Sequence, residues 1–149
     1  MYQQEYLSLD NKYKRIYENL IETRRNMGRT FKNTSGFEKH HIIPKSPGGN
    51  NKSENLVLLT PREHCLAHML LTKIYSGRAK AKMICALNSM IKARNKNRDP
   101  ISSKEYHLMR SVYLAQVQSQ EYRDYRSEIT KNQWTPERRA SVSYKRNSS

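Results

Sequence analysis

Four of the five histidines in the chain lie between positions 40 and 68, in an arrangement that could bind a metal ion and move a proton. His64 and His68 are four residues apart, so on a helix both rings project from one face and can bind the same ion. His40 and His41 are adjacent, and adjacent residues of a strand point to opposite sides. One of them can therefore bind the metal while the other acts as a base, because imidazole titrates near neutral pH. This combination is suited to hydrolysis of a phosphodiester.

Two short strands and a helix must hold these histidines. Residues 38–43 and 56–59 have the pattern of strands, and the intervening residues 44–51 are dense in Pro, Gly, Ser and Asn. We therefore expect two antiparallel strands joined by an ordered loop. The sequence Thr-Pro-Arg-Glu at 60–63 has the form of a capping box with proline at the first helical position. It predicts a helix over residues 61–75.

Further helices are predicted on both sides of this segment. Apolar residues recur at helical spacing between Asp10, the expected N-cap, and Arg25. The same spacing predicts a third helix that ends in the basic stretch 94–99, and a fourth helix over residues 106–117. Residues 135–139 have the form of a new helix start. The expected fold class is α+β and mostly helical, with a central ββα module flanked by α-helices.

The charge of the chain indicates the class of partner. It carries 28 Lys and Arg against 13 Asp and Glu, a formal net charge of +15, and its mean hydropathy is −0.98. The natural partner is a polyanion, which favours DNA or RNA. No apolar run approaches the ~20 residues that a bilayer requires, and the first ten residues lack the core of a signal peptide, so we expect a cytoplasmic protein without membrane contact. Cys65 and Cys85 offer no disulfide framework.

Four sequence elements follow one another at fitting separations: His40-His41-Ile-Ile-Pro, Gly-Gly at 48–49, Asn55-Leu-Val-Leu-Leu-Thr, and Glu-His64-x-x-x-His68. Together they resemble the HNH endonucleases, also called ββα-metal or His-Me finger enzymes. The resemblance covers residues 37–75, about a quarter of the chain. The three-histidine set is similar to that of the nuclease colicins, while the Pro-Lys-x-x-Gly-Gly loop and the short basic chain are similar to phage-encoded, homing-type enzymes.

This resemblance implies a metal-dependent DNA endonuclease and a role for each matched residue. His40 would be the metal ligand from the strand, and His64 and His68 would complete the site from the helix. His41 would be the general base that activates water. Asn55 would bridge backbone groups across the loop and so keep His41 aimed. In some relatives this residue contacts the metal, but we prefer the orienting role because three histidines already leave room for phosphate and water.

The resemblance also implies one divalent metal ion and double-stranded DNA as the partner. Three imidazoles favour Zn²⁺ or another transition ion for binding, whereas related enzymes can use Mg²⁺ or Mn²⁺ for catalysis. We divide the chain into an N-terminal helical extension at 1–27, the HNH core at 28–78 and a basic, helical DNA-binding extension at 79–149. The candidate DNA contacts are Lys45, Arg62, Arg138 and Arg139. Glu63 is explained by capping, and Cys65, about 100° around the helix from His64, is expected in the core.

Two other interpretations stay open. Zinc could hold the same histidines in a non-catalytic module that binds nucleic acid, although such a site has no need of His41. A toxin or defence DNase would have the same chemistry with a different biological role. Structured RNA is an alternative substrate, and a monomer and a homodimer are both compatible with the sequence.

Overall fold

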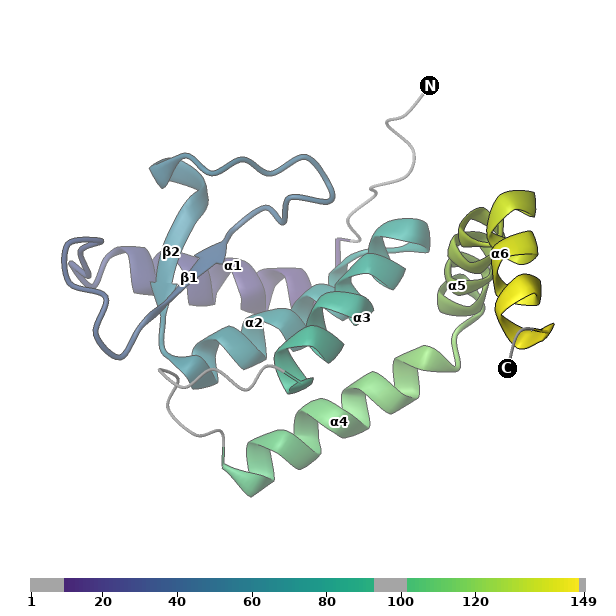
Figure 1. Cartoon of the computed structure of the whole chain (residues 1–149). Coiled ribbons are helices and arrows are strands. Elements are labelled where there is room, and N and C mark those ends of the chain that lie inside the picture. The colour runs from purple at the N-terminus through teal and green to yellow at the C-terminus, as the bar shows by residue number, and fades with distance from the viewer. Residues whose placement is uncertain (1–9, 93–101, 148–149) are drawn as a thin grey trace.

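The computed structural model describes residues 10–92 and 102–147, and over these residues the fold is α+β and mostly helical, as predicted (Figure 1). One two-stranded sheet of β1 and β2 lies among the helices of this described part. The elements in chain order are α1 (Lys12–Arg25), β1 (Glu38–His41), the 3₁₀ turn η2 (Ser53–Asn55), β2 (Leu56–Leu59), α2 (Pro61–Ile74), α3 (Gly77–Lys92), α4 (Ser103–Val117), α5 (Gln120–Gln133) and α6 (Pro136–Asn147). Within the described ranges no helix combines the length and the apolar character needed to cross a membrane.

Strands β1 and β2 form the predicted antiparallel pair. The sequence predicts the first strand through residue 43, but β1 ends at His41. Beyond that point the N–H of Ile42 donates to the carbonyl oxygen of Asn55 at 2.9 Å, and the N–H of Ile43 donates to the Asn55 side-chain oxygen at 2.8 Å. The prediction is wrong by two residues because the main-chain and side-chain oxygens of Asn55, in η2, take the place of a partner strand beyond His41.

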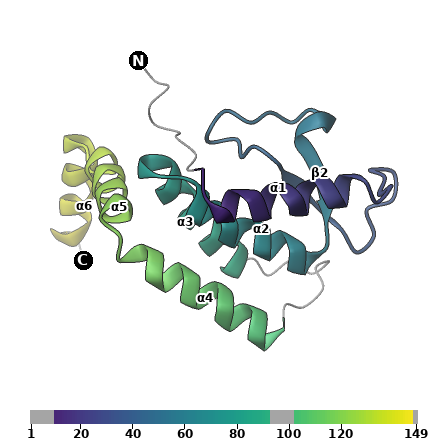
Figure 2. The same cartoon turned by 180° about the vertical axis from the view of Figure 1, so that it is seen from behind.

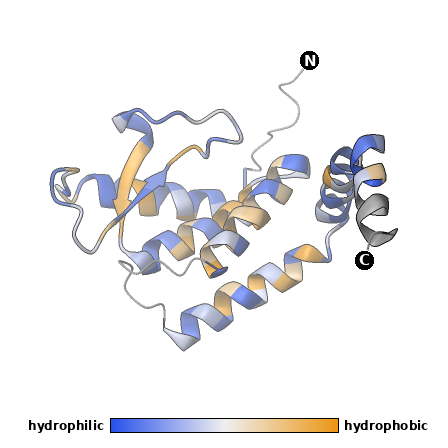
Figure 3. Cartoon of the chain, viewed as in Figure 1, coloured by the Kyte–Doolittle hydropathy of each residue, from blue (hydrophilic) through white to orange (hydrophobic). Residues whose placement is uncertain are grey.

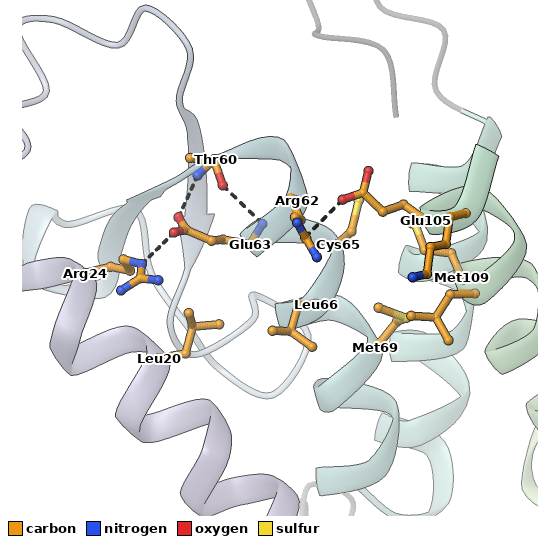
Figure 4. A pocket seen from close by; sticks show the side chains of 12 residues that line it. Leu20, Arg24, Thr60, Arg62, Glu63, Cys65, Leu66, Met69, Glu105 and Met109 are labelled. Atoms are coloured by element: carbon orange, nitrogen blue, oxygen red, sulfur yellow. Dashed lines mark hydrogen bonds and ion pairs between the residues drawn. The ribbon is translucent and has the colours of Figure 1, made fainter. Parts of the chain in front are cut away.

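Helix α2 begins where the capping-box pattern places it. The Thr60 side-chain oxygen accepts the N–H of Glu63, and the Glu63 carboxylate accepts the N–H of Thr60. The same carboxylate forms ion pairs with Arg24 of α1 and with Arg29; Figure 4 draws the Arg24 and Thr60 contacts. The start of α2 is therefore fixed both by its own cap and by cations from the preceding part of the chain, which fixes where its two histidines lie.

Helix α1 packs against α2 and β2 in the first of two apolar clusters. Its N-cap is Asn11 and not Asp10 as predicted: the Asn11 side-chain oxygen accepts the N–H groups of Tyr13 and Lys14. The Asn11 amide nitrogen also donates to the carbonyl oxygen of Lys73 at 3.0 Å. A carboxamide can accept and donate at once, whereas an ionised carboxylate can only accept, so Asn11 both caps α1 and ties it to the end of α2. The buried members of this cluster are Tyr17, Ile21, Val57, Leu59, Ala67, Leu70, Leu71, Ile74, Tyr75, Ala79 and Met83.

The second cluster joins α2, α3 and α4. Cys65 is buried there beside Leu87, Met90 and Met109, which confirms the core position predicted for this cysteine. In both views α4 runs along α2 and α3 and leads to α5 and α6, at the end of the molecule away from the sheet (Figures 1 and 2). The basic stretch 94–99, where the sequence predicts the end of the third helix, lies outside the described residues.

Helix α5 (Gln120–Gln133) was not predicted from the sequence, where no element is placed between the fourth helix, which ends at 117, and the helix start at 135. Ser119 caps α5, and the guanidinium of Arg78 on α3 pairs with Glu128 at 2.8 Å. Figure 3 shows that α5 is mostly hydrophilic, so it offers little apolar periodicity to a pattern search. The next predicted start is confirmed, since α6 begins at Pro136.

Candidate active site

Three histidine rings from two elements meet beside the sheet. His40 comes from β1, and His64 and His68 come from one face of α2, four residues apart. The ring centroids lie 5.0 Å (His40 to His64), 5.3 Å (His40 to His68) and 4.9 Å (His64 to His68) apart. One nitrogen from each ring lies within 4.8 Å of the others, so the three residues could hold a single ion. The structure thus brings together the residues that the sequence singles out as metal ligands.

The nitrogen spacing on α2 fits a transition metal. The Nε2 atoms of His64 and His68 are 3.1 Å apart. Two nitrogens that bind one tetrahedral zinc at ~2.0–2.1 Å are separated by roughly 3.3 Å, so little movement would be required. The donor set of neutral imidazoles is also one that zinc, nickel and copper accept readily.

His40 is the most enclosed of the three ligand candidates. Its side chain is 2% exposed, and its Nε2 lies 2.8 Å from the hydroxyl of Tyr17, which donates to the carbonyl oxygen of Ile42. Burial, followed by the neighbouring imidazoles of His68 and His64, lowers the pKa of His40 to about 2. His40 is therefore uncharged at neutral pH, which is the form that binds metals.

Glu38 orients the second ligand candidate. Its carboxylate oxygen lies 2.6 Å from Nδ1 of His64. A carboxylate accepts this N–H, which leaves Nε2 of His64 facing His68. Glu38 is two residues before His40 on β1, and residues two apart in a strand lie on one face. Glu38 is not among the residues predicted from the sequence, although its spacing of two from His40 was a signal that could have found it.

His41 lies apart from the triad of ligand candidates. It follows His40 directly in β1 and is half-buried, and its Nε2 lies 2.9 Å from the side-chain oxygen of Asn51. An amide oxygen can only accept, so His41 donates from Nε2 and carries its lone pair on Nδ1. Asn51 was not predicted from the sequence, because it lies in a loop dense in turn residues where nothing distinguishes it from Asn50 next to it.

Asn55 holds the loop that carries Asn51. It is 7% exposed, and its amide nitrogen donates to the carbonyl oxygens of Ile43 at 3.0 Å and Asn50 at 2.8 Å. Its side-chain oxygen accepts the N–H of Ile43. These contacts form the bridge between backbone groups that was expected from the sequence. Each of them joins the side-chain amide of Asn55 to a main-chain atom of Ile43 or Asn50.

The candidate DNA-binding residues are spread over the molecule. Lys45 is exposed on the loop after β1, and Arg62 at the start of α2 pairs with Glu105 of α4 at 3.2 Å (Figure 4). Arg138 lies over the ring of Trp134, with 5.8 Å between its guanidinium carbon and the ring centroid, and Arg139 is exposed beside it on α6. In Figures 1 and 2 helix α6 is at the end opposite the sheet, so the arginines of α6 are not part of the histidine site.

Comparison with known proteins finds a family match in the same region of the chain. Residues 28–68 match the model of the HNH endonuclease family. The chain is 46% identical over 66 residues to the probable mobile endonuclease C of Enterobacteria phage T4, and 51% identical over 65 residues to the probable mobile endonuclease D of that phage. It is also 41% identical over 70 residues to an uncharacterized 38.5 kDa protein in psbA intron 1 of Chlamydomonas moewusii.

These similarities are confined to part of each protein. The matched segments make up 44%, 42% and 47% of this chain and 31%, 25% and 19% of the respective relatives. The chain therefore spans less than a third of the length of these curated relatives. No solved structure matches the chain. The match to the HNH endonuclease family, at residues 28–68 of this chain, encloses the three ligand candidates together with His41 and Asn55.

Proposed function

We propose that the chain is a metal-dependent HNH endonuclease that hydrolyses phosphodiester bonds of double-stranded DNA, of the mobile, homing type. The observation that carries this proposal is a cluster of three imidazoles beside a fourth histidine that the cluster does not use. The printed names of the phage relatives, mobile endonucleases, support the homing type, as does the intron location of the algal relative.

His40, His64 and His68 would hold one divalent ion. When bound, the ion supplies positive charge that stabilises the phosphate and the leaving oxygen. Three neutral nitrogen ligands favour Zn²⁺ or another transition ion for affinity, and Mg²⁺ or Mn²⁺ are the further ions to test for cleavage. The pair formed by Glu38 and His64 keeps the helix ligand in one orientation, as carboxylates commonly do around metal-binding histidines.

His41 is the proposed general base. Because Asn51 accepts the hydrogen on Nε2, the lone pair on Nδ1 is the group that takes a proton from water. The water oxygen then forms a bond to phosphorus while the bond from phosphorus to the leaving oxygen breaks. Asn51 and Asn55 are positioning residues in this proposal: Asn51 sets the tautomer of His41, and Asn55 holds the loop that presents Asn51.

The net charge of +15 supports a nucleic acid as the substrate. Cations on a protein surface bind the phosphate backbone of DNA with little regard to sequence. We assign residues 28–78 to the nuclease core, 1–27 to a helical extension and 79–149 to a basic DNA-binding extension. Lys45 would act near the scissile phosphate, and Arg62, Arg138 and Arg139 would contact the duplex farther away.

Cleavage of supercoiled plasmid tests this function. The metal-stripped protein is supplied in turn with Mg²⁺, Mn²⁺, Ni²⁺ and Zn²⁺, beside His41→Ala and the matched control His107→Ala, which removes an exposed histidine of α4. We expect cleavage by wild type and the control, and metal binding without cleavage by His41→Ala. If all three proteins bind DNA and none cuts with any metal, a zinc-stabilised nucleic-acid-binding module replaces the nuclease.

A further inference from the structure

Helix α1 lies outside the residues that match the family, yet it reaches the candidate metal site. Tyr17 of α1 is 6% exposed, and its hydroxyl oxygen lies 2.8 Å from Nε2 of His40. The same hydroxyl donates to the carbonyl oxygen of Ile42 at 2.8 Å. The contact therefore joins a helix before the matched segment to the one ligand candidate on the sheet.

The protons in this small network can be assigned. A carbonyl oxygen can only accept, so the single hydroxyl proton of Tyr17 points to Ile42. Toward His40 the hydroxyl oxygen must then accept, which places a hydrogen on Nε2 of His40. A neutral imidazole has only one N–H, so Nδ1 of His40 carries the lone pair.

Packing and hydrogen bonding hold the Tyr17 hydroxyl in the position that sets the tautomer of His40. Tyr17 is packed in the first apolar cluster with Ile21 and Tyr75, and the bond from Asn11 to the Lys73 carbonyl fixes the start of α1 against the end of α2. The hydroxyl is thereby held between the carbonyl oxygen of Ile42 and Nε2 of His40.

We propose that Tyr17 is a positioning residue that fixes His40 in the tautomer with hydrogen on Nε2, so that Nδ1 is the nitrogen that binds the metal. This inference rests on the proposed function. It means that α1, through Tyr17, contributes to the metal site. Tyr17 would do for His40 what Glu38 does for His64: an oxygen outside the ligand set accepts one ring N–H, which leaves the other ring nitrogen for the ion.

The tautomer can be read directly in the metal-free protein. Long-range ¹H–¹⁵N correlation spectra distinguish protonated from unprotonated ring nitrogens, and wild-type His40 should carry hydrogen on Nε2. A spectrum with hydrogen on Nδ1 would overturn the proposal without any variant. Tyr17→Phe should lose the preference, while Tyr75→Phe, which removes a hydroxyl from the same cluster, should keep it.

Metal affinity gives the second measurement. Loss of an outer partner of a metal-binding histidine typically weakens binding about 10–100-fold, so the Zn²⁺ dissociation constant of Tyr17→Phe should rise by that factor and that of Tyr75→Phe should not. Equal affinity of Tyr17→Phe and wild type would overturn the role of Tyr17 and leave the endonuclease standing. A wild-type protein that binds none of the tested divalent ions would overturn both proposals.

Discussion

The side chain of Asn55 and the main chain of Ile43 are joined by two hydrogen bonds that run in opposite directions. The Asn55 oxygen accepts the N–H of Ile43 at 2.8 Å, and the Asn55 nitrogen donates to the Ile43 carbonyl oxygen at 3.0 Å. The same nitrogen donates to the carbonyl oxygen of Asn50. One amide thereby closes the loop that carries Asn51, the partner of His41.

Asn55→Ala should weaken both folding and cleavage. The change removes the three hydrogen bonds that the buried Asn55 side chain makes to the main chain of Ile43 and Asn50, which costs about 1–3 kcal/mol in the free energy of unfolding. Small misplacement of a catalytic group can lower a rate about 100-fold, so cleavage should fall by at least this factor. Zinc affinity should stay near that of wild type, because the triad lies on β1 and α2. Urea unfolding, plasmid cleavage and zinc titration measure the three quantities.

Asn50→Ala is the matched control for this prediction. It removes an exposed side chain from the same loop but keeps the carbonyl oxygen that Asn55 binds. It should cleave within a few-fold of wild type. If Asn55→Ala cleaves as well as Asn50→Ala, the bridge across the loop has no part in aiming His41.

Gly49 approaches the same peptide so closely that no side chain fits. A Cβ atom at this position would overlap the carbonyl oxygen of Ile43 and lie 2.6 Å from its carbonyl carbon. Gly49→Ala must therefore push the main chain of Ile43 away from Asn55, and overpacking of this kind costs about 1–3 kcal/mol or more. The free energy of unfolding and the cleavage rate should both drop.

Gly36→Ala separates this clash from ordinary backbone strain. Gly36 has φ +75° and open space around its Cβ position. Alanine there therefore loses stability only through the left-handed backbone conformation, which costs about 1–2 kcal/mol in the free energy of unfolding. Urea unfolding should rank Gly49→Ala below Gly36→Ala, with cleavage lost only in the former. The reverse ranking would contradict the close approach at Gly49.

Local sequence signals predicted the parts of the site that a single element defines. The capping box at Thr60 gave the start of α2, and with it the shared face of His64 and His68. The residues that sequence reasoning missed act across the chain. Tyr17 meets His40 over 23 positions, and no periodicity within α1 shows that one of its core residues also bonds to the sheet.

The missed helix and the overlong strand have related causes. Helix α5 is held partly by ion pairs to α3, which leave no apolar pattern in the sequence. Strand β1 ends early because Asn55 accepts the N–H of Ile42 with its main-chain oxygen and the N–H of Ile43 with its side-chain oxygen. In both regions polar contacts join residues that are distant in the sequence, and a short window along the sequence does not contain both partners.

The charge of Glu63 should make stability depend on pH at the acid end. Partial burial would raise the pKa of Glu63, but hydrogen bonds from Arg29, Thr60 and Arg24 outweigh it and lower the pKa from 4.5 to about 2. A carboxylate with a lowered pKa stabilises the fold fully above its ordinary value, and this contribution is lost as the pH falls through its folded value. Glu63→Gln should therefore reduce the free energy of unfolding by about 1–2 kcal/mol at neutral pH and by progressively less toward acid.

Urea unfolding of wild type and Glu63→Gln over a pH series measures this difference. Glu18→Gln is the control variant, because it replaces an exposed carboxylate of α1 with a carboxamide. Its change in the free energy of unfolding measures the effect of losing one negative charge from a very basic chain. The two-protein difference should be constant above pH 4.5 and should shrink as the pH falls toward about 2. A difference that persists unchanged to the acid end would mean that the cap, and not the charge held by Arg24 and Arg29, supplies the stability.

Metal binding should stabilise the fold through the histidine triad. An ion that binds only the folded state at 100 times its dissociation constant adds about 2.7 kcal/mol to the free energy of unfolding. The triad joins β1 to α2, so a bound ion would connect the sheet to the helix. Zinc should raise the unfolding temperature of wild type by several degrees, and a chelator should reverse the rise. His68→Ala should remove most of the effect, whereas His107→Ala, on α4, should retain it. Equal zinc-dependent shifts in the two variants would mean that the ion binds elsewhere, and the assignment of His68 as a ligand would fail.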